Sequence, residues 1–176
     1  MLLENKNAVI YGGGGAIGGA VARAFAREGA RVFLAGRTLE GLEEVAEGIR
    51  SAGGVAETAQ VDALEETAVD EHANAVAASA GGIDISFNAI SIRDVQLIPL
   101  VEMSREDFMS PILTGTSTHF LTARAAARHM IEQGSGVILT LSSSAVRAYV
   151  AGVHVGGFGI AGTAIEAPSR NCLRRS

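Results

Sequence analysis

The chain has 176 residues, of which 48% are apolar and 19% are charged, with 22 glycines and only three prolines. This composition is typical of a soluble α/β protein and excludes collagen-like and disordered classes. The net charge of −5 gives no general attraction for phosphate backbones or anionic lipid, so nucleic acid and membranes are excluded as expected partners. The length predicts a single domain over residues 1–176.

Cysteine usage indicates the compartment. Cys172 is the only cysteine, which excludes an internal disulfide framework and a cysteine metal cluster, and no metal site is predicted. No apolar run approaches the length of a membrane span, and the opening MLLENKN is too short and too acidic for a signal peptide. We therefore expect a cytoplasmic protein.

Strands and helices are predicted to alternate along the chain. A strand at 7–11 runs into a glycine cluster and a helix that Gly29 closes, and the pattern continues with strands at 31–36, 55–61 and 83–88 and helices at 38–52 and 64–80. After an irregular stretch at 91–103, Ser104 and Asp107 open a long helix that ends near Gln133. A strand at 136–141 and a last helix interrupted by Pro168 follow.

This alternation predicts right-handed βαβ crossovers and a parallel sheet covered on both faces. The expected fold is therefore α/β, a Rossmann-type doubly wound parallel sheet in one three-layer α/β/α domain. Ligands of such sheets bind beyond the carboxyl ends of the strands.

A glycine-rich turn joins the first strand to the first helix. Within YGGGGAIGG, Gly13, Gly15 and Gly18 satisfy the pattern G-x-G-x-x-G. Glycine permits the tight turn and the close approach of backbone to pyrophosphate, and the helix N-terminus offers unpaired N–H groups. The sequence predicts a dinucleotide cradle here, and the alternative is a turn that only connects the two elements.

The end of the second strand predicts which nucleotide is bound. An acidic residue at this place would hold the ribose 2′-hydroxyl of NAD, but the strand ends at Gly36-Arg37 with no acid. A guanidinium suits a 2′-phosphate through bidentate hydrogen bonds, so NADP(H) is the predicted cofactor. The alternative is that Arg37 is a solvated surface arginine.

The motifs together resemble the short-chain dehydrogenase/reductase family over nearly the whole chain. The family's T-G-x-x-x-G-I-G appears as YGGGGAIG, I-D-x-L-V-N-N-A-G as IDISFNAIS, and the fifth helix and strand as HFLTARAAARHMIEQGSGVILTLSS. The resemblance implies an oxidoreductase acting on a small carbonyl or alcohol substrate. It also implies a set of cofactor-binding residues: Gly12, Gly13, Gly15, Ala16, Ile17, Gly18, Arg37, Asp62, Asn88 and Ala89.

The catalytic part of the resemblance is incomplete. The family's catalytic serine falls at Ser143, but its helix asparagine falls at Gly115 and its Tyr-x-x-x-Lys pair at Phe158 and Gly162. Phenylalanine has no proton to transfer, and losing a general acid typically costs about 10²- to 10⁴-fold in rate. No lysine follows Lys6, so no shift of the alignment restores the pair.

Other groups are candidates for the missing acid. Tyr149 and His154 follow the fifth strand and are counted with Ser143 as candidate catalytic residues, against the simpler interpretation that they are exposed loop residues. His72 and His129 are interpreted as surface groups on helices, and His119 as a packing residue.

Three functions stay open from the sequence. The chain is an NADP(H)-dependent oxidoreductase with an atypical catalytic site, a nucleotide-binding protein without turnover, or a shortened relic that self-associates. The resemblance implies family elements beyond NCLRRS, so the fold is expected to be C-terminally shortened, with a natural end and a truncation or frameshift both left open. It also implies a homo-oligomer through the helices at 104–133 and around 156–170.

Overall fold

The computed structural model describes residues 1–143 and 156–169. Contacts divide the chain into two compact units. The first comprises Met1–Ser91 with Phe120–Leu139, and the second comprises Ile92–His119 with Thr140–Ser176. Each unit is described by itself below, and a single domain over 1–176 stays a prediction.

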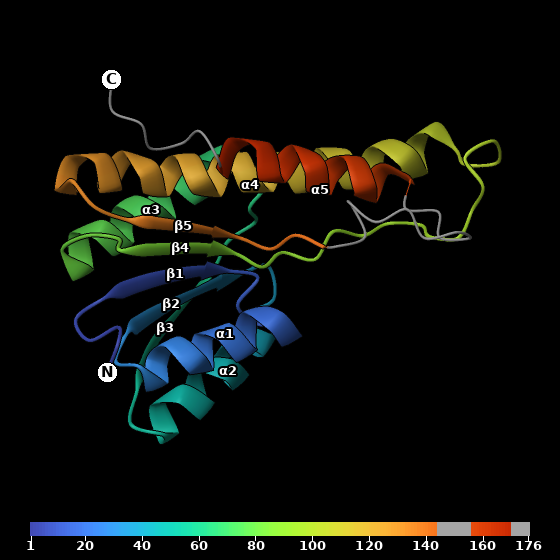
Figure 1. Ribbon diagram of the computed structural model, residues 1–176. Helices are drawn as coiled ribbons and strands as arrows, with labels where there is room; N and C mark the ends of the chain where they lie inside the picture. Colours follow the sequence, from blue (N-terminus) through green and yellow to red (C-terminus); the bar gives the residue numbers. More distant parts are fainter. Residues whose placement is uncertain (144–155, 170–176) are drawn as a thin grey trace. The chain divides into compact units, whose positions relative to one another are not determined.

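The first unit is built on a parallel sheet (Figure 1). Its strands are β1 (Asn7–Tyr11), β2 (Arg31–Gly36), β3 (Val55–Gln60), β4 (Ile85–Asn88) and β5 (Val137–Thr140), in the order β3-β2-β1-β4-β5. Strand β1 pairs in parallel with β2 and β4, with Ala8 opposite Val32 and Ile85. This order confirms the predicted α/β Rossmann-type sheet.

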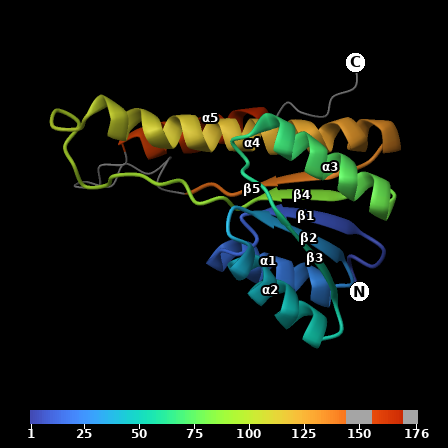
Figure 2. The ribbon, with the colours of Figure 1, turned by 180° about the vertical axis from the view of Figure 1, so that it is seen from behind.

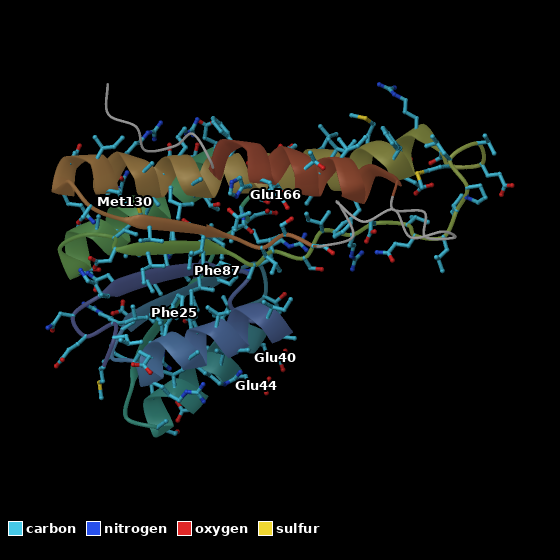
Figure 3. The ribbon with its side chains drawn as sticks, viewed as in Figure 1. Phe25, Glu40, Glu44, Phe87, Met130 and Glu166 are labelled. Atoms are coloured by element: carbon cyan, nitrogen blue, oxygen red, sulfur yellow. The ribbon has the colours of Figure 1, made fainter. Side chains whose placement is uncertain are left out.

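Helices cover both faces of this sheet. Helices α1 (Ala16–Arg27) and α2 (Leu39–Ser51) pack on one face, and α3 (Glu66–Ala80) and the Phe120–Gln133 part of α4 (Arg105–Gln133) pack on the other (Figure 2). Side chains alternate along each strand, so Ala8 and Ile10 enter the α1–α2 core while Val9 and Tyr11 enter the α3–α4 core. Figure 3 shows Phe25 and Phe87 in the first core and Met130 in the second.

Glycines follow two helices of the first unit, and the sequence predicts the first of them, Gly29. Gly29 follows α1 with φ of +93°, and Gly81 caps α3 with φ of +83°. The helix expected from Leu64 begins at Glu66, because the Asp62 carboxylate accepts the Leu64 N–H at 3.0 Å in a turn before the helix.

In the second unit α5 (Gly156–Ser169) lies beside the first half of α4 (Figure 1). A Cβ on Gly157 would overlap the carbonyl oxygen of Phe108, so glycine is what permits this close packing. Ser104 Oγ accepts the Asp107 N–H at 3.0 Å, which confirms the predicted start of α4. The helix continues through Pro168 to Ser169, so the predicted interruption there is wrong.

None of the helices in the described ranges is long and apolar enough to span a membrane.

Candidate nucleotide site and catalytic region

The turn between β1 and α1 requires glycine at specific positions. Gly12 has φ of +76°, and a Cβ there would lie 2.8 Å from the Ala89 carbonyl carbon. A Cβ on Gly18 would overlap the Gly12 carbonyl oxygen. Gly13 is less tightly confined, with the Leu34 Cβ at 3.0 Å from its ideal Cβ position. These glycines let the chain fold back on itself directly above the strand ends.

The first turn of α1 presents donors to solvent. Gly15 is the N-cap and supplies no side-chain cap, and its own N–H donates to the Gly12 carbonyl at 3.0 Å. The first N–H of the helix to bond back is that of Gly19, to the Gly15 carbonyl at 2.8 Å. The N–H groups of Ala16, Ile17 and Gly18 therefore have no partner within the helix. Residues 14–17 are exposed. An exposed helix N-terminus without a blocking side chain fits a pyrophosphate group.

Arg37 is exposed at the carboxyl end of β2. Its carbonyl accepts the Gln60 side-chain amide at 2.9 Å, and its guanidinium makes no ion pair with any described residue. The N-cap of α2, Thr38, makes no side-chain capping bond. Glu40 and Glu44 follow on the exposed side of α2 (Figure 3). The arrangement leaves the Arg37 guanidinium available for an anionic group.

The strand ends beside the turn are fixed by hydrogen bonds. The Asn88 side-chain amide donates to Thr122 Oγ1 at 3.2 Å and accepts the Ile90 N–H at 3.0 Å. The Ala89 N–H donates to the Tyr11 carbonyl at 2.9 Å. Asn88 therefore holds the end of β4 against α4, while Ala89 lies against Gly12. Asp62, half-buried after β3, uses one carboxylate oxygen for Leu64.

A contact that the sequence does not reveal lies below the turn. Tyr11 is buried with its hydroxyl 3.4 Å from His72 Nδ1, and the two rings pack edge to face. His72 is therefore half-buried rather than a surface group, because α3 presents it to the end of β1. Burial lowers the pKa of His72 to about 4 and raises the pKa of Tyr11, so both groups are neutral near pH 7.

The second unit contains the positions where the sequence resemblance predicts the family's catalytic residues. A Cβ on Gly115 would lie 2.7 Å from Ile92 Cδ1 and 3.4 Å from Ala161 Cβ. The surroundings of Gly115 are thus apolar side chains from the loop and from α5. Phe158 is half-buried and Gly162 is buried, and both lie on α5.

Ser143 is half-buried and ends the described segment after β5. Its neighbour Ser142 donates to the Glu166 carboxylate on α5 at 2.7 Å. His119 is buried with Nδ1 3.4 Å from Thr140 Oγ1, as its interpretation as a packing residue predicts, and burial lowers its pKa. Tyr149 and His154 lie outside the described residues.

Within residues 1–143 and 156–169, no three side chains of the His, Cys, Asp or Glu type are grouped so as to hold a metal ion.

Comparisons with known proteins agree with this geometry. Residues 6–155 match the family described as short chain dehydrogenase. Gluconate 5-dehydrogenase of Gluconobacter oxydans is 35% identical over 141 residues, covering 80% of this chain and 54% of that protein. The chain thus spans about half the length of this curated relative.

Two solved structures are also similar. A metagenomic short-chain oxidoreductase in complex with NADP has a TM-score of 0.80 and 30% identity, over 94% of this chain and 74% of that one. NAD⁺-bound xylitol dehydrogenase has a TM-score of 0.86 and 27% identity, over 95% of this chain and 63% of that one. From its glycine turn, its sheet order and these matches, the chain belongs to the short-chain dehydrogenase family.

Proposed function

We propose that the protein is an NADP(H)-dependent oxidoreductase of the sugar and alcohol dehydrogenase kind with an atypical catalytic site. The observation that carries this proposal is the glycine turn, where Gly12 and Gly18 allow the fold-back and the exposed residues 14–17 leave the N-terminus of α1 open. NADP(H), when bound, supplies or accepts the hydride.

The residues proposed to hold the cofactor fall into groups according to the part of the cofactor that each contacts. The turn and first helical N–H groups receive the pyrophosphate, Arg37 receives the 2′-phosphate, and Asp62 and Ala89 border the adenine. Asn88 acts by holding the end of β4, since its amide already bonds Thr122 and Ile90. The proposed set of pyrophosphate contacts is Gly12, Gly13, Gly15, Ala16, Ile17 and Gly18.

The preference for NADP(H) rests on Arg37. Both cofactors occur among similar proteins, because one solved structure holds NADP and another holds NAD⁺. In this chain the end of β2 carries a guanidinium without an ion pair among the described residues and no carboxylate before Glu40. A cation there favours a phosphate over a free hydroxyl.

The substrate class comes from the relatives. Their names specify gluconate and xylitol, both polyhydroxylated carbon chains. We therefore propose a small alcohol or sugar-type substrate, with the corresponding carbonyl as product. Ser143 is proposed to donate one hydrogen bond to the reacting oxygen, a contribution of about 1 kcal/mol.

Turnover is proposed to be slow. Phe158 cannot transfer a proton, and Gly162 cannot lower the pKa of a neighbouring group, so the advantage of a positioned general acid is missing. Tyr149 and His154 remain the candidates for a substitute acid.

A second candidate function is nucleotide binding without turnover. It is favoured by the apolar surroundings of Gly115, where Ile92, Ala161 and Ile165 fill the space beside the helix. Three family positions then lack their catalytic side chains while the cradle is kept.

One experiment separates these functions. The full chain is titrated with NADPH and NADH by calorimetry and then incubated with NADP⁺ and either xylitol or gluconate, while reduced cofactor is followed by absorbance. Slow formation of NADPH supports the oxidoreductase. Tight NADPH binding with no reduced cofactor supports the binding protein, and no binding of either nucleotide excludes both.

We further propose that the protein forms a homo-oligomer in a reducing compartment such as the cytoplasm. Apolar side chains are exposed on the described helices, including Phe120 and Ile131 on α4 and Ile160 on α5. A single cysteine supports the reducing compartment.

A further inference from the structure

One hydrogen bond ties the segment after β5 to α5 within the second unit. The Ser142 hydroxyl donates to Glu166 Oε1 at 2.7 Å. An O–H donor at this distance from a carboxylate makes a charge-assisted hydrogen bond, which is stronger than a neutral one. Figure 3 labels Glu166 on α5. Glu166 is the only ionisable residue in the sequence of this helix.

The position of Glu166 on α5 is informative. Phe158, Gly162 and Glu166 follow one another in steps of four residues, so they lie along one face of the helix. Phe158 and Gly162 are the positions where the family places its tyrosine and lysine. Glu166 therefore lies one turn beyond them.

The helix that carries Glu166 is itself well held. Ala161 and Ile165 are buried, and both lie 3.4 Å from where a Gly115 Cβ would be. At the start of the helix, Gly157 packs directly on the backbone of Phe108. Because α5 is packed in this way, the Glu166 carboxylate is held in place and can restrain the segment after β5.

We propose that Glu166 is a positioning residue for Ser143, acting through Ser142. The proposal rests on the proposed function, in which the Ser143 hydroxyl bonds the reacting oxygen of the substrate. Ser142 and Ser143 share a peptide unit, so holding the Ser142 side chain against α5 also restrains the backbone from which the Ser143 side chain projects. A site built without such support is loose, and small misplacements of a reacting group reduce its effect strongly.

The test compares kinetic constants in the full chain. KM and kcat for xylitol and gluconate with NADP⁺ are measured for Ser142→Ala, Glu166→Leu and Glu166→Gln. Thr163→Ala is the matched control, since the exposed Thr163 hydroxyl bonds only the Gly159 carbonyl of the same helix among the described residues.

We expect KM to rise about fivefold in Ser142→Ala and in Glu166→Leu, the effect of losing one hydrogen bond to substrate. Glu166→Gln keeps an acceptor for Ser142 and is expected to stay within about twofold of the parent protein. Thr163→Ala is expected to match the parent, and NADPH affinity is expected to be equal in all variants.

The decisive comparison uses a second background. If Glu166 acts through Ser143, Glu166→Leu has no further effect on KM once Ser143→Ala is present. Additive effects of the two substitutions, or an unchanged KM in both Ser142→Ala and Glu166→Leu, overturn the positioning role. If Glu166→Leu does not fold, Ser142→Ala with and without Ser143→Ala decides the question.

The outcomes also distinguish failure of the positioning role from failure of the proposed oxidoreductase function. A parent protein that forms no reduced cofactor overturns the proposed function and the positioning role together. A parent protein that turns over, with kinetics insensitive to Ser142 and Glu166, overturns only the positioning role.

Discussion

At the residue scale, the glycines of the turn between β1 and α1 are needed for two different reasons, the fold and the binding of the cofactor. A Cβ on Gly18 would overlap the Gly12 carbonyl oxygen, a backbone atom that cannot move alone. A Cβ on Gly15 would meet only that same oxygen at 3.3 Å, and φ at Gly15 is an ordinary −81°. We therefore expect that Gly18 is needed for stability and that Gly15 is needed for binding of the cofactor.

We expect Gly18→Ala to lower the free energy of unfolding by about 1–3 kcal/mol, the usual cost of overpacking. Gly15→Ala is the matched control and is expected to leave stability within about 1 kcal/mol while weakening NADPH binding, because its methyl group lies where backbone approaches pyrophosphate. Urea denaturation and calorimetric titration measure the two effects. Equal losses of unfolding free energy in Gly18→Ala and Gly15→Ala would contradict the different roles given to the two glycines of the turn.

Arg37 decides cofactor preference at the same scale. We expect the parent protein to bind NADPH at least several-fold tighter than NADH, and Arg37→Asp to narrow or reverse this ratio by repelling the 2′-phosphate and accepting a ribose hydroxyl. Arg31→Gln, at the opposite end of β2 and normally paired with Glu57, is the control that keeps the ratio. Equal affinities of the parent protein for both nucleotides refute the assignment.

At the scale of elements, the contact between β1 and α3 predicts a pH effect on stability. Burial lowers the pKa of His72 to about 4 in the folded state, whereas an unfolded histidine titrates near 6.5. Between these values the unfolded chain binds more protons, so stability falls as pH decreases from about 6.5 to about 4. Burial of His119 acts in the same direction.

We expect the His72 contribution to this loss to be at most about 3 kcal/mol, and we expect His72→Gln to remove it. The free energy of unfolding is measured by urea denaturation at several pH values in the parent and the variant. His129→Gln on α4 controls for the loss of a histidine. A parent and a His72→Gln variant with the same pH slope would contradict the buried, neutral state of His72.

The elements themselves could be predicted where the determinants are local. The short apolar runs of β1 and β2, and Gly29 after α1, depend on neighbours in the chain, and the structure confirms them. The glycine turn could be found for the same reason. The Tyr11–His72 contact could not be predicted, because it depends on how α3 is placed against β1.

In the candidate catalytic region, too, the features that depend on packing between distant segments could not be predicted from the sequence. The apolar surroundings of Gly115 and the Ser142–Glu166 hydrogen bond join segments distant in sequence, and their pairing follows from how α4 and α5 pack. The predicted interruption of the last helix at Pro168 is wrong, because α5 continues through Pro168 to Ser169.

At the scale of the whole molecule, exposed apolar side chains on α4 predict self-association. Phe120 is 57% and Ile131 62% exposed, and their spacing of eleven residues places them on one face of the helix. We expect a homo-oligomer at micromolar concentration, measured by light scattering. Phe120→Glu with Ile131→Glu is expected to shift the mass toward the monomer, and a parent protein with the monomer mass would refute the prediction.

The central claim is that the chain catalyses hydride transfer with NADP(H) although Phe158 lies where the sequence resemblance predicts the family's proton-transferring tyrosine. The rate of NADPH formation from NADP⁺ and xylitol or gluconate in the parent protein and in Phe158→Tyr tests it most directly. Phe120→Tyr, which adds a hydroxyl on an exposed part of α4, is the control.

We expect the parent protein to form NADPH slowly and Phe158→Tyr to accelerate it by about 10²-fold, the lower range of the contribution of a positioned general base that takes up the proton of the alcohol. Phe120→Tyr is expected to leave the rate unchanged. Failure of both the parent protein and Phe158→Tyr to form reduced cofactor, with NADPH binding intact, would contradict the account.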